Sequence, residues 1–286
     1  MADHVPALLR PVWGARALVR VPAEMHVRLG HQVLVFGQAL AAIPFVVRHY
    51  RKELLRLITD VTWGNGSLVV GGGTVGVIFI LCGFGGITVG MESHTALSLL
   101  TMSPLTGAIS GFATTRELAP LLATLAFGAQ AGCRFTAQLG SMRISEEIDA
   151  LESIAIRPLP YLITTRMLAA MTAIVPLYCV GLSTAYVATR VMVLLLGGTT
   201  LGTYDHYFHQ FLEPVDILYS IAKVLVFVTI SSFIQCYYGF VAAGGPEGVG
   251  VAAGRAIKVT IIVTVFINLV LSLSIWGIDP GIRISG

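Results

Sequence analysis

Five segments of the chain are strongly apolar and are separated by shorter, more polar stretches. They cover approximately residues 68–91, 104–132, 166–196, 215–238 and 256–278. A helix needs roughly twenty apolar residues to cross a bilayer, so each segment predicts one membrane-spanning helix. A sixth stretch, 26–47, is interrupted by His31, Gln32, Gln38 and Pro44, which favours a helix lying in the membrane interface.

The polar stretch at the centre of the chain carries the densest group of charges. Arg143, Glu146, Glu147, Asp149 and Glu152 fall within ten residues. Placing them at the bilayer centre would cost about 12–17 kcal/mol, so the stretch is expected in water or at the interface. Ser145 suits an N-cap, and Pro158 stops helix growth, which predicts a short helix over 146–156.

This short helix has two distinct faces. Ile144, Ile148, Leu151 and Ile154 recur at helical spacing and form an apolar stripe, while Glu147, Asp149 and Glu152 lie opposite. One interpretation is an amphipathic loop helix that rests on its own membrane domain. The other is a docking helix for a cytosolic partner, whose basic groups would meet the acidic face.

The distribution of Lys and Arg predicts the orientation. Eight of these residues precede residue 68, the central stretch holds Arg134, Arg143, Arg157 and Arg166, and the predicted loops near 92–103 and 199–214 hold none. Because cytoplasmic loops are enriched in Lys and Arg, we expect the N-terminus, the central stretch and the 239–255 loop in the cytoplasm and the C-terminus outside. We therefore divide the chain into a cytoplasmic or interfacial segment 1–67, a membrane domain 68–278 and an outer tail 279–286.

Composition agrees with a membrane protein. Hydrophobic residues make up 55% of the chain and charged residues 12%, whereas a soluble domain carries about 25% charged residues. The net charge of +3 is small, and we expect no nucleic-acid partner. The four cysteines show no spacing typical of a metal site, and no cleavable signal peptide is evident.

Two charges fall inside the second predicted span. If that helix starts at Pro104, Arg116 lies about 18 Å along it, near mid-membrane, and Glu117 follows directly. Ionisable residues at such a depth mark a functional site by default. The alternative is a structural ion pair with another span, for which Lys223 and Arg190 are the candidate partners of Glu117.

Other motifs are weak. GGGTVG at 71–76 opens an apolar span without the strand that a dinucleotide site needs, and no GxxxxGK[ST] sequence exists, so this chain is not expected to bind ATP.

His206 and His209 form the one candidate metal pair, although solvated or partner-facing side chains fit them better. An intramembrane protease or lipid-modifying enzyme is disfavoured because HExxH, GxGD and GxSxG are missing, and a secondary transporter because five spans do not form two equal halves.

Four features of the sequence match a known family: GSMRISEEIDALESIAIRPLPYLITTRMLAA from residue 140, RELAP at 116–120, GGPEGVGVAAGRA at 244–256 and Lys223. On these residues the sequence resembles the MlaE/YrbE permeases of Mce-type lipid ABC transporters. It implies that helix 146–156 couples to a separate ATPase, which binds the ATP and Mg, so no cofactor and no catalytic residue is expected here. The coupling residues are then Arg143, Glu146, Glu147, Asp149, Leu151 and Glu152. The lipid pathway, between two permease subunits, is assigned to Arg116, Glu117 and Leu100, with Lys223 and Arg190 as structural charges.

Departures from the family pattern bear on the partners. Gln130 and Gln138 stand where the family often has Arg and Glu, and Arg134 replaces a small residue. A heterodimer could keep the missing groups in a sister permease, so we expect a non-identical partner, as in actinobacterial Mce systems, and a B-type role here. The resemblance also implies MCE-domain proteins on the outer side of the cell membrane. Fatty acid import is the expected activity, with phospholipid transport as the alternative.

Overall fold

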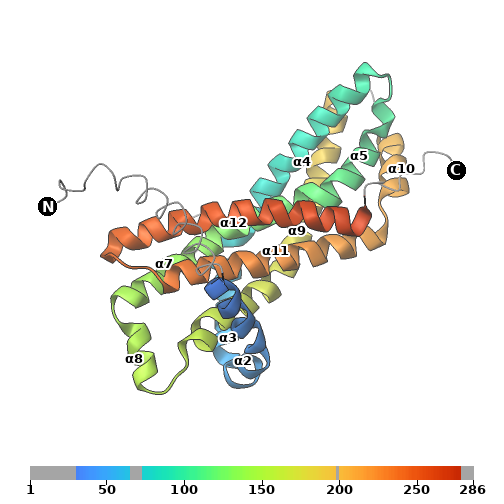
Figure 1. Cartoon of the computed structure of the whole chain (residues 1–286). Helices are drawn as coiled ribbons and strands as arrows, with labels where there is room; N and C mark the ends of the chain where they lie inside the picture. Colours follow the sequence, from blue (N-terminus) through green and yellow to red (C-terminus); the bar gives the residue numbers. More distant parts are fainter. Residues whose placement is uncertain (1–29, 65–72, 198–199, 278–286) are drawn as a thin grey trace, which may run out of the picture.

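The computed structural model describes residues 30–64, 73–197 and 200–277, and these residues form helices without any strand (Figure 1). The expected all-α membrane architecture is confirmed. The outer tail 279–286 and the first 29 residues lie outside the described part. The helices are Gly30–Ala41, α2 (Ile43–His49), α3 (Arg51–Trp63), α4 (Gly73–Leu99), α5 (Thr106–Ala113), α6 (Ala119–Phe127), α7 (Cys133–Ile144), α8 (Glu147–Ser153), α9 (Thr165–Leu196), α10 (Leu201–Phe211), α11 (Pro214–Phe240) and α12 (Gly245–Trp276).

Four of the predicted spans are long apolar helices. Gly73–Leu99, Leu159–Leu196, Pro214–Phe240 and Gly245–Trp276 are long and apolar enough to cross a membrane. The last helix starts eleven residues before the predicted 256. The Gly-rich stretch from Gly244, which falls in the predicted 239–255 loop, is mostly the first part of α12, and Pro246 is tolerated there because it lies in the first helical turn.

The predicted span 104–132 is not one α-helix. The helical run continues from Ser103 to Ile144 and contains two π turns, Thr114–Leu118 and Gly128–Gly132, which separate α5, α6 and α7. The run therefore extends twelve residues beyond the predicted end. Because a π turn adds a residue to the helical repeat, it changes which face of the following helix meets its neighbours.

The first described helices form a broken pair. Gly30–Ala41 and Ile43–His49 are bent by 44° at Ala42, with Pro44 at the start of α2. Together they are apolar enough to count as a broken span or a re-entrant loop. The residues predicted to form one interfacial helix therefore form two.

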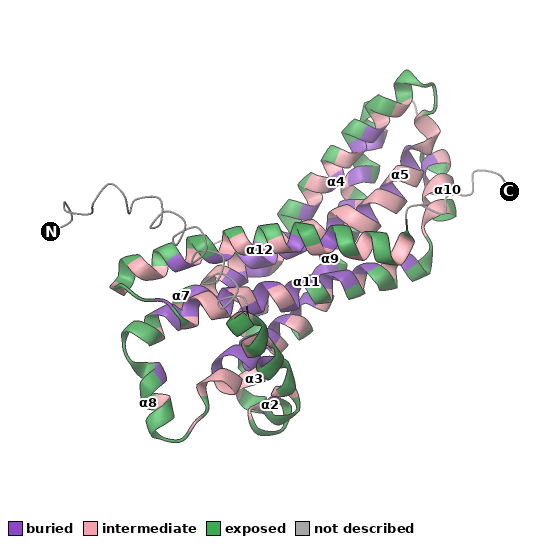
Figure 2. Ribbon diagram, viewed as in Figure 1, coloured by how far each residue is buried: buried purple, intermediate pink, exposed green. Residues whose placement is uncertain are grey.

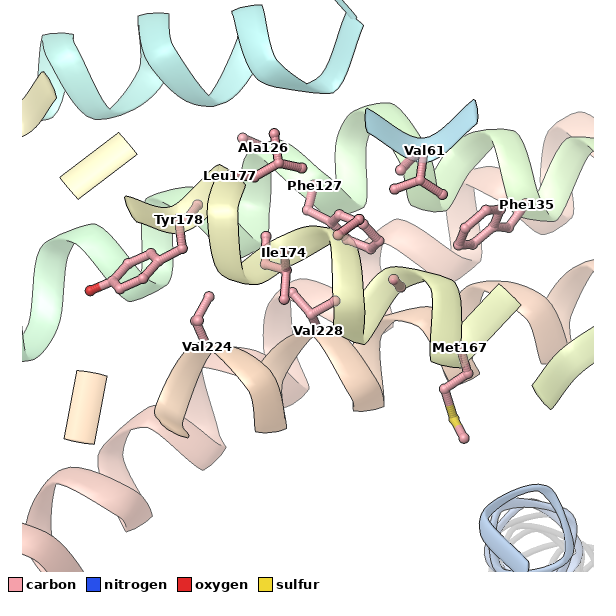
Figure 3. Packing of buried hydrophobic residues seen from close by; sticks show 14 of the residues in the cluster. Val61, Ala126, Phe127, Phe135, Met167, Ile174, Leu177, Tyr178, Val224 and Val228 are labelled. Carbon is pink, nitrogen blue, oxygen red and sulfur yellow. The ribbon is translucent and has the colours of Figure 1, made fainter. Parts of the chain in front are cut away.

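The core lies between α3, α6, α7, α9 and α11. Phe127, Ile174, Val224 and Val228 are fully buried there and pack against one another (Figure 3). Buried positions follow the inner sides of the long helices, while their outer sides stay exposed and apolar (Figure 2).

Helix α4 packs closely on α9 through glycine. A Cβ added to Gly86 would stand 2.3 Å from the carbonyl oxygen of Ala185, and the Thr189 hydroxyl donates to the Gly86 carbonyl oxygen at 2.8 Å. Small residues allow this approach, which supports association of helices in lipid.

The predicted outer loop 199–214 is mostly helix. Helix α10 is N-capped by Thr200, whose hydroxyl accepts from the Thr203 N–H, and it packs on α5. Tyr204 donates to Ser110 at 2.8 Å, and burial raises the pKa of its hydroxyl. His206 and His209 therefore lie on a helix, and no group of three potential metal ligands occurs among the described residues. Helix α10 and α8 lie at opposite ends of the molecule (Figure 1).

Candidate functional site

The charged central stretch forms a compact exposed helix at the end of α7. Helix α8 covers Glu147–Ser153 and is shorter than the predicted 146–156. It ends at Ala155 (φ 63°), where the Ala155 N–H donates to the Glu152 carbonyl and the Ile156 N–H to the Leu151 carbonyl, each at 3.0 Å. This is a Schellman motif, which closes the helix three residues before Pro158.

The predicted N-cap is wrong. Ser145 is the C-cap of α7, and its hydroxyl lies 3.0 Å from the Ser141 carbonyl oxygen and 2.9 Å from a Glu147 carboxylate oxygen, either of which can accept its hydrogen. Glu146 has a left-handed backbone (φ 60°) and makes the turn between α7 and α8. Because α7 stays helical up to Ile144, only this single left-handed residue and Ser145 separate the two helices.

Helix α8 has an anchored side and a free acidic side. Ile148 is 1% exposed and Leu151 packs against the core, whereas Ile144 and Ile154 are 38% and 66% exposed. Two residues of the apolar stripe therefore pack within this chain, and the other two stay exposed. Glu146, Glu147, Asp149 and Glu152 are all exposed, and Arg143 pairs with Asp149 at 2.7 Å. Such a surface can meet a partner that offers basic and apolar groups.

The second polar group surrounds the π turn Thr114–Leu118. Pro120 has no N–H, so it cannot donate to the carbonyl oxygen of Arg116 four residues earlier. The ammonium nitrogen of Lys223 in α11 lies 2.6 Å from that oxygen and donates to it. A buried cation from another helix thus binds the backbone beside the proline of the RELAP sequence.

Glu117 is held by three polar side chains. Lys223 lies 3.3 Å from Oε1, Ser272 donates to Oε1 at 2.5 Å and Asn268 donates to Oε2 at 2.6 Å. The Lys223 side chain is 0% exposed, but the Glu117 side chain is 41% exposed. This carboxylate is therefore positioned by α11 and α12 and still reaches the outside of the chain.

Arg116 points to a different partner. Its Nε and Nη2 atoms lie 2.8 and 2.7 Å from one oxygen of Asp216, and the Trp276 ring nitrogen donates to the other oxygen at 2.9 Å. The guanidinium also lies over the rings of Phe112 and Trp276, at 4.3 and 5.0 Å. The side chains of Arg116 and Asp216 are only 11% and 5% exposed. Arg116 and Glu117 thus point to different helices, as their adjacency in a helix requires.

The Arg116 side chain lies near one end of α11 and α12. Asp216 is the third residue of α11, and Trp276 is the last residue of α12. The Arg116 carbonyl oxygen contacts Lys223, the tenth residue of α11. The mid-membrane depth expected for Arg116 stays a prediction.

Several expected site residues lie elsewhere. Arg190 does not contact Glu117, because it pairs with Asp205 of α10 at 2.5 Å, at a half-exposed position. Leu100 is 65% exposed in the turn after α4. Arg134 already has a partner within the chain, since its Nη2 lies 2.9 Å from Asp60 Oδ1.

Sequence reasoning missed four residues of the second polar group: Asp216, Asn268, Ser272 and Trp276. Asp216 carried a usable signal, because it is the only acidic residue within the predicted span 215–238. The other three are not distinctive in an apolar helix, and only the packing of α12 on α11 brings them to Arg116 and Glu117.

Comparison with known proteins gives consistent results. The family model described as Permease MlaE matches residues 65–274. A Rickettsia prowazekii protein named "Probable ABC transporter permease protein" is 29% identical over 199 residues, covering 66% of this chain and 73% of its own. A Synechocystis protein of the same designation is 26% identical over 200 residues, covering 70% and 76%. The chloroplast protein trigalactosyldiacylglycerol 1 of Arabidopsis thaliana is 27% identical over 199 residues, covering 70% and 57%.

The family match spans both polar groups, α8 and the surroundings of Arg116, and nearly all of the described membrane helices. The chain therefore belongs to the MlaE permease family, whose members are multi-pass, non-catalytic membrane subunits of ABC transporters.

Proposed function

We propose that this permease moves a lipid across a cell membrane, driven by a cytosolic ATPase that docks on α8. The exposed acidic side of α8 carries this proposal: four carboxylates are exposed while Ile148 fixes the helix to the body of the protein. The partly exposed Ile144 and Ile154 offer the apolar contact that a stable interface requires.

The lipid pathway is proposed to run past Glu117. An exposed carboxylate fixed by Lys223, Asn268 and Ser272 sits beside the apolar outer side of α12, so it offers a polar contact to one end of an amphipathic molecule and leaves its tails in apolar surroundings. The relative whose name is that of a lipid, trigalactosyldiacylglycerol, supports a lipid cargo. Fatty acid import is our finer proposal, and phospholipid transport is the alternative.

The assembly is proposed to contain a non-identical sister permease, MCE-domain proteins on the outer side and the ATPase, which holds ATP and Mg. Gln130 and Gln138 support the sister subunit because they lack the charges that this family often has there. The orientation follows from the basic residues at the α8 end, with the N-terminus in the cytoplasm. A purified complex with two copies of this chain and no sister would contradict the heterodimer.

Charge reversal on α8 tests the docking proposal. We expect the double variant Glu147→Arg, Glu152→Arg to lose co-purification of the ATPase, because like charges then face the basic partner surface. Both side chains are exposed, so the permease itself should fold and reach the membrane. Glu92→Arg, an exposed acidic position on α4, is the matched control and should leave the complex intact. Undiminished ATPase recovery with the double variant would refute docking through α8.

A further inference from the structure

A pocket at the α8 end of the molecule contains a buried arginine that forms no salt bridge with any described residue. The pocket, about 700 Å³, lies between α3, α7 and the start of α9. Its polar lining residues are Arg56, Thr59, Gln138, Ser141 and Arg166, together with the carboxylates Glu53 and Asp60. It is separate from the second polar group, which lies around α11 and α12 at the other end.

Arg166 is 8% exposed and has unused donors. One terminal nitrogen donates to the Leu162 carbonyl oxygen of its own helix at 3.0 Å, while the buried Nε has no hydrogen-bond partner among the described residues. No carboxylate lies within 4 Å of its nitrogens in the same part of the chain. A buried charge without a partner is costly, so this guanidinium is suited to an anion from outside the chain.

The nearby carboxylates are already engaged. Asp60 pairs with Arg134 at 2.9 Å, and Glu53 lies 3.7 Å from Arg56. Glu53 and Asp60 line the pocket together with Arg56 and Arg166, so the charges of the lining balance, but neither carboxylate lies within 4 Å of the Arg166 nitrogens. Gln138, Ser141 and Thr59 add neutral hydrogen-bond donors. A ligand group with several acceptor oxygens can bind several of these donors at once.

The position of the pocket indicates the source of the anion. Helix α3 forms one wall, and its Leu55 and Trp63 side chains are 65% and 50% exposed, as expected for a helix that rests on lipid. Arg166 lies seven residues after Leu159, where the spanning helix begins, which is about 10 Å along the axis. This depth, beside an interfacial helix, corresponds to the level of lipid head groups.

From this geometry we infer that the pocket between α3, α7 and α9 is a phosphate-binding site that takes the head group of a membrane phospholipid on Arg166. The acyl chains then lie along the exposed apolar side of the bundle. The site goes beyond the proposed transport function, because it lies at the opposite end from Glu117 and would hold a lipid even in a permease that transports something else.

The test uses the full-length chain purified in detergent, with phosphatidylglycerol counted by native mass spectrometry after lipid titration. We expect wild type to retain phosphatidylglycerol and Arg166→Met to bind it about tenfold or more weakly, since a hydrogen bond to a charged group has about that effect. Arg166→Lys keeps the charge and should recover part of the affinity. Arg190→Met, which removes a half-exposed arginine at the other end, is the matched control and should bind as wild type does.

Two further arms separate the alternatives. Diacylglycerol, which lacks the phosphate, should show no dependence on Arg166, and inorganic phosphate should compete only weakly if the lipid is the ligand. If Arg166→Met does not fold, Gln138→Leu, at a half-buried position on the same wall, should still weaken phosphatidylglycerol binding. Equal lipid retention by wild type and these variants would overturn the proposal.

Discussion

Replacing Asp216 by Asn isolates the charge of the buried Arg116 pair while keeping the shape of the side chain. In the native protein one carboxylate oxygen accepts from two nitrogens of Arg116 at 2.7 and 2.8 Å, and the other accepts from Trp276 at 2.9 Å. An asparagine has one acceptor oxygen and an NH₂ group that is only a donor. Either Arg116 or Trp276 therefore faces a donor instead of an acceptor.

The expected cost follows from burial. The two side chains are 11% and 5% exposed, so solvent cannot replace the lost carboxylate. Removing one partner of a buried ion pair costs about 3–5 kcal/mol. The contacts of Arg116 with the rings of Phe112 and Trp276 are present in both proteins, so they do not change this difference. We expect a loss of about 3–5 kcal/mol for Asp216→Asn.

A double-mutant cycle distinguishes pairing from packing. The double variant Arg116→Met, Asp216→Leu removes both charges and should be more stable than either single variant, Arg116→Met or Asp216→Leu, because apolar residues of similar volume often replace a buried pair without loss. The measurement is the free energy of unfolding from detergent titration of the purified protein. Asp205→Asn is the control: Arg190 and Asp205 are 45% and 37% exposed, and such pairs contribute about 0–1 kcal/mol. Effects of the two single substitutions that simply add, within about 0.5 kcal/mol, would refute the reasoning.

Two further substitutions test the helix packing and the proposed pathway. Gly86→Val should destabilise the protein by about 1–3 kcal/mol in the same unfolding assay, because its Cβ would meet the Ala185 backbone at 2.3 Å. Gly83→Ala, whose Cβ meets only a methyl group of Thr184 at 3.4 Å, is the control, and equal effects of the two would contradict close α4–α9 packing. Arg116→Gln and Glu117→Leu, each checked for assembly, should reduce lipid transfer by the reconstituted complex, and full transfer by both would remove these residues from the pathway.

Hydrophobic pattern alone predicted the fold class and four of the long helices. Membrane helices are predictable because the bilayer imposes length and polarity on each of them separately. The run from Ser103 to Ile144 was harder, because its continuation through Arg134 and Gln138 depends on α7 packing against α11 and α12. Helix α10 was also missed, since a short amphipathic helix in a region with His and Asp resembles a polar loop.

The polar contacts were predictable only in part. Lys223 was named as a candidate partner of Glu117, and it does lie beside that residue, but Arg190 is held by Asp205 on α10. Which cation meets a carboxylate depends on helix rotation, and the π turn at Thr114–Leu118 rotates Arg116 and Glu117 relative to a regular helix. A prediction that assumes 3.6 residues per turn throughout the helix does not include that rotation. Asn268 and Ser272 become relevant only because they lie one turn apart on the side of α12 that meets Glu117.

One helical run, Ser103–Ile144, joins the proposed ATPase-docking helix α8 to the proposed lipid contact at Glu117. The contacts of this run limit how it can move. Glu117 and Arg143 are 26 residues apart on this run, which corresponds to about 39 Å. Helix α8 is fixed to its end by the buried Ile148 and the Arg143–Asp149 pair, so a force on α8 acts on α7. At the other end the run is held by Lys223 on the Arg116 carbonyl and by Asp216 on the Arg116 side chain. Any axial shift of the run must therefore exchange or break those contacts, and a transport cycle driven through α8 has to change the surroundings of Glu117.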